Sequence, residues 1–185
     1  MTIEKLDQNI FVFNNFITEY EASQLIDIAI NATESEWSEY NYTERHKNDE
    51  WENRILLLDQ CSLFDENKKI IVNTIFDRIK DEIRNILNKD IYEYVGFKGI
   101  YRSIQGQEMK THSDQGLGPK FKYGIVLYLN DNYSGGEIYY PNVGVEIKPK
   151  AYSLVLHPAH EAYRHGVKEV SYGTRYSMTV FVKLK

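Results

Sequence analysis

Hydrophobic positions near the start of the chain mark a strand followed by a helix. The run from Ile10 to Phe13 is apolar throughout and predicts an opening strand. Thr18 and Glu21 have the spacing of a capping box, in which a hydroxyl and a carboxylate each accept a free backbone amide at a helix start. One apolar stripe continues with Leu25, Ile26, Ala29 and Ile30. This pattern predicts a helix over residues 18–32.

A second amphipathic pattern predicts a longer helix over residues 66–88. Its apolar residues recur with helical spacing and form one stripe of Ile71, Ile75, Ile79, Ile83, Ile86 and Leu87. Charged residues occupy the opposite side, as expected of a helix that packs one face on a core. We interpret this helix as scaffold, preceded by a short strand from Arg54 to Leu58.

Residues 34–53 lack any periodic pattern and are rich in aromatic side chains. The segment holds Trp37, Tyr40, Tyr42 and Trp51. A loop of this length is uncommon in a compact domain unless it packs on the structure or serves a site. Two interpretations stay open: a long loop packed on a sheet, or a lid over a substrate.

From Tyr94 onward the pattern changes to short alternating segments separated by Gly, Pro and Asn. The candidate strands are residues 96–104, 109–113, 122–130, 136–140, 144–147, 152–156, 162–167 and 174–184. Such a series is typical of a double-stranded β-helix, also called a jelly roll. We expect a mainly β, cupin-like fold whose one sheet is covered by the two N-terminal helices.

The chain contains no repeat, low-complexity tract or linker. Residues 1–185 are therefore expected to form a single domain of ordinary size. Within it, residues 1–93 would supply helical support and the lid-like loop, and residues 94–185 would form the jelly-roll core.

Composition narrows the location and the partners. With 42% hydrophobic residues, the chain has no apolar run as long as a membrane span. The first residues carry acids and lack an apolar core, so no secretory signal is expected. Cys61 is the single cysteine, which favours a small buried residue in a reducing compartment, the cytoplasm. The net charge of -5 argues against a nucleic-acid partner, and no membrane partner is expected.

Two histidines and an aspartate form the most informative chemical pattern. Because alternate side chains of a strand share one face, His112 and Asp114 would emerge together, about 7 Å apart. His165 would join them from a neighbouring strand. Two imidazoles and one carboxylate are the ligands that hold Fe(II) on one face of an octahedron, with three positions left open.

His157 is an alternative third ligand. We place it, with His160, on a loop around Pro158 between the last strands. Only His165 is followed by Gly-Val and, ten residues later, by an arginine, so we favour His165 as the ligand.

The last predicted strand has a polar face. Arg175, Ser177 and Thr179 alternate with less polar residues. A guanidinium group binds a carboxylate through two parallel hydrogen bonds, and a hydroxyl two residues on lies on the same face. The pattern favours an anion site, although a solvated strand face would look the same.

These blocks resemble the Fe(II)- and 2-oxoglutarate-dependent dioxygenases, and within them the prolyl 4-hydroxylase-like branch. The resemblance extends from about residue 97 to the end of the chain. Five ordered blocks carry it: Gly106–Met109 with His112–Asp114, Ile125–Asn130, Gly135–Glu137, His165–Val167 and Gly173–Ser177. Such a series is far more specific than any single block.

The resemblance implies a set of cofactors and site residues. Its cofactors are Fe(II), 2-oxoglutarate and O2, with ascorbate as a reductant. The iron ligands implied are His112, Asp114 and His165, with Arg175 also catalytic. The cosubstrate-binding residues implied are Arg175, Tyr128, Ser177 and Tyr101. Arg175 would bind the distal carboxylate, helped by Tyr128 in the position before Leu-Asn.

Two positions qualify the resemblance. Members usually carry a tyrosine three residues before Gly106, where this chain has Ser103; Tyr101, on the same strand face, would replace it. Collagen-type members typically have a lysine at the position of Arg175. The arginine points towards the oxygen-sensing and the bacterial or viral prolyl hydroxylases.

Three functions follow as hypotheses. The first is hydroxylation of a peptidyl proline, with a proline-containing peptide or protein as partner. The second keeps the iron chemistry but acts on another amino-acid side chain, a free amino acid or a small metabolite. The third is a non-catalytic cupin-like binding module. The complete ligand set together with Arg175 argues against the third.

Overall fold

The computed structural model describes residues 1–39, 54–95, 99–117 and 122–185. Its two α-helices are α1 (Glu19–Asn31) and α2 (Glu66–Leu87), within two residues of the predicted ends. Thr18 and Glu21 form the predicted capping box at the start of α1. Asp65 caps α2 by accepting the backbone N–H of Lys68 at 3.0 Å. Both helix predictions are confirmed.

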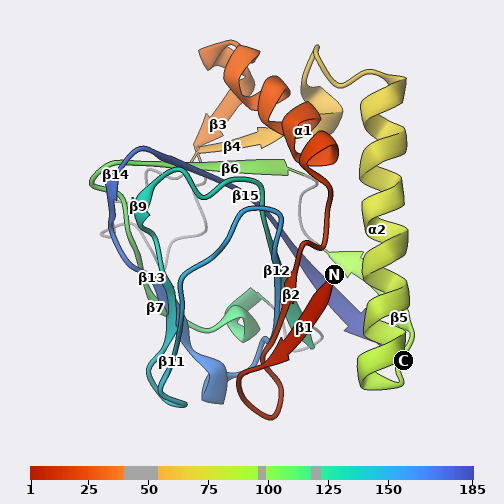
Figure 1. Ribbon diagram of the computed structural model, residues 1–185, viewed down its shortest axis with the longest axis vertical. Helices are drawn as coiled ribbons and strands as arrows, with labels where there is room; N and C mark the ends of the chain where they lie inside the picture. The colour runs from red at the N-terminus through yellow and green to blue at the C-terminus, as the bar shows by residue number, and fades with distance from the viewer. Residues whose placement is uncertain (40–53, 96–98, 118–121) are drawn as a thin grey trace.

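Antiparallel strands form two main sheets (Figure 1). The larger sheet has the order β1 (Thr2–Lys5), β2 (Phe11–Asn14), β12 (Leu154–Pro158), β8 (Tyr123–Tyr128), β15 (Thr174–Leu184), β6 (Gly99–Ile104), β4 (Arg54–Leu57), β3 (Trp37–Glu39), and β5 (Ile91–Val95) pairs with β15. The smaller sheet has the order β11 (Val145–Ile147), β10 (Ile138–Tyr140), β13 (His165–Val167), β7 (Met109–His112). Strands β9 (Ser134–Gly135) and β14 (Val170–Tyr172) pair separately. The arrangement is a double-stranded β-helix, as predicted.

Several strands were not predicted. Four strands of the larger sheet, β1 to β4, come from residues before 60. Of these, β2 and β4 lie at the predicted strands Ile10–Phe13 and Arg54–Leu58, whereas β1 and β3 were not predicted, and neither were β5, β9 and β14. The N-terminal part of the chain therefore extends the larger sheet at both of its edges as well as covering it.

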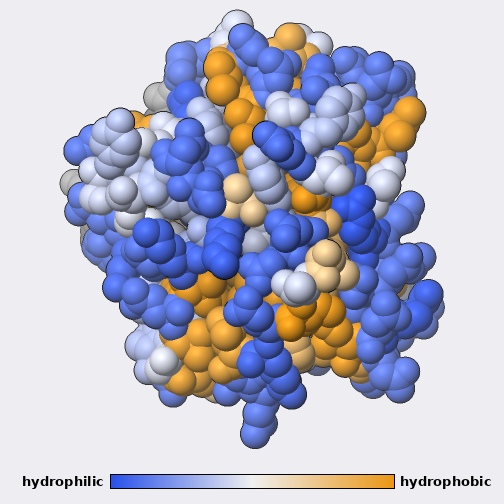
Figure 2. Space-filling model, in the orientation of Figure 1, coloured by the Kyte–Doolittle hydropathy of each residue, from blue (hydrophilic) through white to orange (hydrophobic). Residues whose placement is uncertain are grey.

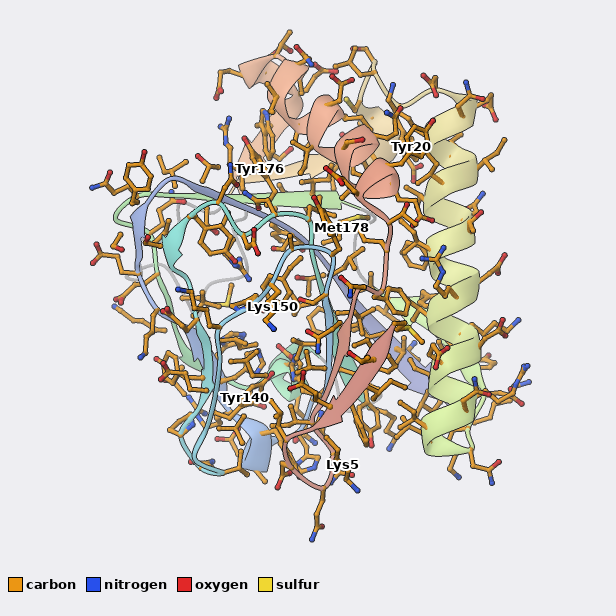
Figure 3. All side chains as sticks on the ribbon, in the orientation of Figure 1. Lys5, Tyr20, Tyr140, Lys150, Tyr176 and Met178 are labelled. Atoms are coloured by element: carbon orange, nitrogen blue, oxygen red, sulfur yellow. The ribbon has the colours of Figure 1, made fainter. Side chains whose placement is uncertain are left out.

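The helices cover one face of the larger sheet, as predicted (Figure 1). Side chains from α1 and α2 pack there in one apolar cluster with alternate residues of the central strands, including Leu127, Leu156 and Met178. The remaining residues of these strands face the other way, into the space between the two sheets. That interior holds a smaller cluster that includes Tyr128, Tyr140 and Val155. Figure 3 labels Tyr140 in the interior and Met178 on the helix side.

The described part of the 34–53 segment is packed rather than lid-like. Glu34–Glu36 forms a 3-10 turn, and Trp37 follows in β3. The Trp37 side chain is buried in the helix-side cluster, with the Arg102 guanidinium 4.3 Å from its ring centroid. Trp37 is therefore part of the core, which for this residue agrees with the interpretation of a loop packed on the sheet. Residues 40–53, with Tyr40, Tyr42 and Trp51, lie outside the described residues.

Two further expectations concern Cys61 and the membrane. Cys61 is buried, as predicted, and burial raises the pKa of its thiol. In the part of the chain that the structure describes, neither helix has the length and apolar character that a membrane crossing requires. Polar residues cover most of the face shown in Figure 2, with apolar patches between them.

Candidate active site

Three predicted ligands converge at one end of the smaller sheet. His112 is the last residue of β7 and His165 the first of β13, and the two face each other directly in the antiparallel pair. Asp114 follows on the turn after β7. Its Oδ1 lies 3.5 Å from His112 Nε2 and 3.8 Å from His165 Nε2. The ligand atoms of all three residues lie within 4.8 Å of one another, so one metal ion could contact all of them.

Asp114 reaches this position through a turn. We expected His112 and Asp114 on one extended strand, but β7 ends at His112 and Asp114 begins the 3-10 turn Asp114–Leu117. The backbone N–H of Gln115 donates to the carbonyl of Ala159 at 2.8 Å, which fixes the turn against the end of β12. The two ligands therefore come from the end of a strand and from the turn that follows it, and not from one face of a single strand.

Backbone carbonyls set the tautomer of both ligand histidines. His112 Nδ1 lies 2.9 Å from the Lys110 carbonyl, and His165 Nδ1 lies 3.1 Å from the Tyr163 carbonyl. A carbonyl only accepts, so each Nδ1 carries the proton. Each Nε2 then presents its lone pair towards the other ligands, as metal-binding imidazoles do.

Burial sets the charge of the site. Burial lowers the pKa of His165 to about 3, with the neighbouring imidazole of His157 acting in the same direction. Burial opposes ionisation of Asp114, but the adjacent imidazoles outweigh it and lower the pKa of the carboxyl group. At neutral pH the site therefore contains a carboxylate and a neutral imidazole, the forms that bind a metal.

His157 lies beside the site and not on a loop, so its predicted placement is wrong. It belongs to β12, which runs through to Pro158, and it is 1% exposed. Its ring centroid lies 4.4 Å from that of His165 and 5.4 Å from that of Tyr140. Among the described residues, the group that could share a metal contains His165 and omits His157.

The predicted anion site lies on the inner face of the larger sheet. Arg175 and Ser177 stand on β15, with Ser103 opposite Arg175 and both Tyr101 and Tyr128 opposite Ser177. Arg175 and Tyr128 are both buried, and the guanidinium carbon lies 5.0 Å from the Tyr128 ring centroid. The structure thus brings these five residues to one region, with Tyr101 half-buried at its side.

This interior contains buried polar atoms that lack partners. Within the described ranges, no hydrogen bond reaches Arg175 Nε or the hydroxyls of Tyr128, Tyr133 and Tyr140. Burial raises the pKa of Tyr128 and of Tyr133, so both hydroxyls keep their protons and can donate. An unpaired buried donor is costly, and a cationic group among neutral donors is suited to a bound carboxylate.

Sequence reasoning missed Tyr133 as a member of this group. A Cβ atom on Gly136 would lie 2.9 Å from the Tyr133 ring and 3.2 Å from Arg175 Cδ, so the two side chains meet over this glycine. Gly136 also has a φ of +70°, which favours glycine. The tyrosine two residues before Gly-Gly was the available signal.

The donor set fits the cofactors that the sequence predicts. Two imidazoles and one carboxylate, arranged around one point, suit Fe(II) and leave open coordination positions. A buried arginine with tyrosine hydroxyls suits the distal carboxylate of 2-oxoglutarate.

Comparisons with known proteins agree with this chemistry. Residues 99–183 match the 2OG-Fe(II) oxygenase superfamily. No curated protein matches the chain in sequence. A viral collagen prolyl hydroxylase of Paramecium bursaria chlorella virus-1, solved with 2OG, is similar with a TM-score of 0.68 and 15% identity, over 95% of this chain and 96% of that one.

Two further solved structures share the fold. A prolyl hydroxylase of Trichoplax adhaerens, in complex with a hypoxia inducible factor peptide fragment, has a TM-score of 0.69 and 19% identity over 95% of this chain and 83% of that one. A 2OG-Fe(II) oxygenase family oxidoreductase of Burkholderia pseudomallei has a TM-score of 0.53 and 20% identity over 64% and 57%. Residues 99–183, which include the His-Asp-His group, are thus similar to the 2OG-Fe(II) oxygenase superfamily, and the solved structures share the fold of the chain.

Proposed function

We propose that this protein is an Fe(II)- and 2-oxoglutarate-dependent dioxygenase that hydroxylates a prolyl residue of a peptide or protein. One observation supports it most: two solved prolyl hydroxylases share the fold over 95% of this chain, and one of them is bound to a peptide. We also propose that residues 1–185 act as one catalytic domain, since strands from both ends of the chain build the sheet behind the site.

In this proposal each site residue has a defined task. His112, Asp114 and His165 hold the iron, with both Nε2 atoms and the carboxylate directed at one point. Arg175 and Tyr128 bind the distal carboxylate of 2-oxoglutarate, and Ser177 and Tyr101 line the same face of the sheet. When bound, iron and 2-oxoglutarate supply the activation of dioxygen that C–H hydroxylation requires.

The exposure of the ligands indicates where the substrate approaches. The His112 side chain is 21% exposed, against 4% for Asp114 and 7% for His165. A peptide therefore reaches the metal over His112 and β7, while the interior behind Asp114 and His165 stays closed to water. Exclusion of water protects the reaction from side reactions.

The test supplies the protein with Fe(II), 2-oxoglutarate, ascorbate and a panel of proline-containing peptides. Each peptide is paired with a control in which alanine replaces proline. We expect a mass gain of one oxygen on prolyl peptides alone, with an equal amount of succinate. Two results together would overturn the prolyl assignment. The first is succinate production without oxidation of any prolyl peptide, and the second is oxidation of a different side chain or of a small metabolite.

A further inference from the structure

Two glycines allow Tyr133 to pack against Arg175. A Cβ atom on Gly136 would lie 2.9 Å from the Tyr133 ring and 3.2 Å from Arg175 Cδ. A Cβ atom on Gly173 would lie 3.2 Å from both Cα and Cβ of Tyr133. Both glycines have a positive φ, of +70° and +80°, which other residues rarely adopt. The fold therefore keeps the space at both positions for this tyrosine.

Asn130 ties the segment that carries Tyr133 to both neighbours of Arg175. Its side-chain nitrogen donates to the Thr174 carbonyl at 2.7 Å, and its side-chain oxygen accepts the backbone N–H of Tyr176 at 2.8 Å. These bonds fix the short segment between β8 and β9 along β15. The position of the tyrosine relative to the guanidinium is thus set by the fold, so a ligand that binds both need not order them.

The Tyr133 hydroxyl is buried, protonated and ready to donate. The side chain is 8% exposed, and no hydrogen bond to its hydroxyl is found among the residues that the structure describes. Burial raises the pKa of Tyr133, although the neighbouring Arg175 guanidinium acts in the opposite direction. The Tyr128 hydroxyl has the same surroundings: it is buried without a partner in the described ranges, and the same cation acts on it. Two hydroxyl donors therefore lie beside one guanidinium.

Tyr140 differs from these two tyrosines, although its buried hydroxyl also lacks a partner in the described part of the chain. Its ring centroid lies 5.5 Å from that of His165. Burial raises the pKa of Tyr140, and Tyr128 and Asp114 act in the same direction. Tyr140 therefore lies on the metal side of the interior, whereas Tyr128 and Tyr133 lie on the arginine side.

A buried carboxylate needs more donors than one arginine supplies. Its two oxygens offer about four lone-pair sites. The planar fork of a guanidinium fills two of them with parallel N–H···O bonds. The other sites need further donors, because a buried charged acceptor without partners is costly. One hydroxyl from Tyr128 and one from Tyr133 match the number that remains.

We propose that Tyr133 is a further cosubstrate-binding residue, whose hydroxyl donates to the distal carboxylate of 2-oxoglutarate beside Arg175 and Tyr128. This inference rests on the proposed function and completes the donor set of its anion site. It also gives the site selectivity. A 2-oxo acid that has no distal carboxylate leaves the guanidinium and both hydroxyls unpaired, and a site built to form such hydrogen bonds rejects a ligand that lacks the matching group.

The test measures 2-oxoglutarate binding without turnover, by calorimetry on protein loaded with Mn(II), a redox-stable substitute for Fe(II). Tyr133→Phe keeps the ring and removes only the hydroxyl. We expect about 10- to 100-fold weaker binding, as for the loss of one hydrogen bond to a charged group. The melting temperature of the ligand-free variant should stay equal or rise, because the hydroxyl that is removed has no partner among the described residues.

Tyr94→Phe is the matched control. The Tyr94 hydroxyl donates to the Phe76 carbonyl at 2.7 Å, on the helix side of the larger sheet. Removal of this hydroxyl breaks an existing hydrogen bond and touches no part of the anion site. Tyr94→Phe should therefore melt at a lower temperature than the wild type and bind 2-oxoglutarate with the same affinity.

A second ligand separates a direct contact from a change in the shape of the site. 2-Oxovalerate has the same 2-oxo acid end as 2-oxoglutarate but a methyl group in place of the distal carboxylate. Wild type and Tyr133→Phe should bind it with equal affinity, because it offers the hydroxyl no acceptor. If the variant lost affinity for both ligands by the same factor, Tyr133 would only shape the site and the inference would be wrong.

The outcomes also separate this inference from the proposed function. If the wild type binds no 2-oxoglutarate, the proposed function fails and the inference fails with it. If the wild type binds 2-oxoglutarate, Arg175→Ala weakens the binding and Tyr133→Phe does not, the anion site stands and only the role of Tyr133 is overturned.

Discussion

The central strands β8, β12 and β15 have two buried faces with different chemistry. On the helix side, Leu127, Leu156 and Met178 belong to a cluster of buried apolar side chains. On the interior side, the same strands present Tyr128, His157 and other polar residues. Since adjacent residues of one strand belong to different faces, burial alone does not decide the role of a residue. The alternation of the strand separates a stabilising face from a chemical one.

The energetic consequences of the two faces are opposite. Burial of a leucine or isoleucine side chain on the helix side stabilises the fold by about 1.5–3 kcal/mol. On the interior side, each unpaired polar atom, such as Arg175 Nε or the Tyr128 hydroxyl, costs about 1–3 kcal/mol. The interior is therefore arranged to bind ligands at the expense of stability. Variants on the helix side should mainly lower stability, whereas variants in the interior should mainly lower activity.

The largest effect is expected from Asp114→Ala. This change removes the only carboxylate of the described ligand group and leaves two imidazoles without it. We expect loss of succinate production and of Mn(II) binding. The fold should be retained, because Asp114 lies between the two sheets and not in the apolar cluster on the helix side. Asp59→Ala, at an exposed turn on the helix side, is the control and should keep full activity. Succinate production by Asp114→Ala would contradict the proposed metal site.

A smaller but still large effect is expected from Arg175→Ala. A buried carboxylate of the cosubstrate would lose its cationic partner, a change that costs about 3–5 kcal/mol. The apparent Michaelis constant for 2-oxoglutarate should rise by two orders of magnitude or more. Arg175→Lys should recover part of this loss, because lysine offers a point charge and not a fork.

Arg78 provides the matched control on the helix side. Its guanidinium pairs with Glu21 at 2.8 Å and donates to the Phe16 carbonyl at 2.6 Å. Arg78→Ala should lower the melting temperature and leave the Michaelis constant for 2-oxoglutarate unchanged. An unchanged constant in Arg175→Ala as well would show that the cosubstrate carboxylate is bound elsewhere.

Two adjacent residues of β8, one on each face, should give the sharpest contrast between the faces. The effects of changing them are expected to be intermediate in size. Leu127→Ala should destabilise the fold by about 3 kcal/mol through the cavity that it leaves, with little change in cosubstrate binding. Tyr128→Phe should weaken 2-oxoglutarate binding while stability stays equal or rises, because an unpaired buried hydroxyl is removed. Denaturant titration and cosubstrate titration of both variants measure this. If both variants changed stability and cosubstrate binding equally, the distinction between the two faces would be wrong.

Much of the fold was predictable because local patterns encode it. The helix stripes and the capping box of Thr18 identified both helices, and alternation identified the long strands. Strand β1 was missed because all four of its residues are exposed, so it has no apolar alternation. It is an edge strand whose pairing with β2 comes from tertiary structure.

The site was predictable where its residues follow a motif. His112, Asp114, His165 and Arg175 stand in ordered blocks, and the structure brings them together. His157 was misplaced because Pro158 suggested a loop, whereas proline is tolerated as the last residue of a strand. Its place beside His165 depends on the pairing of β12 with β8, which no local pattern reveals.

The smallest effect is expected from a polar cluster outside both faces. The Glu36 carboxylate accepts four hydrogen bonds, from the backbone N–H and the hydroxyl of both Thr33 and Ser62, at 2.8–2.9 Å. The backbone donors of Ser62 and Thr33 contribute most to lowering its pKa from 4.5 to about 2. If polar groups outside the interior serve stability, Glu36→Gln should lower the melting temperature but leave cosubstrate binding unchanged.

The sign of the pH dependence follows from this shift. Because the folded state lowers the pKa of Glu36, its contribution is complete above the ordinary value of 4.5 and is lost as the pH falls towards 2. The difference in melting temperature between the wild type and Glu36→Gln should therefore be constant at neutral pH and narrow across this acidic range. Glu169→Gln, an exposed control, should not reproduce the narrowing. A difference independent of pH would mean that the carboxylate acts through shape and not through its charge, so that polar groups outside the interior stabilise the fold by packing alone.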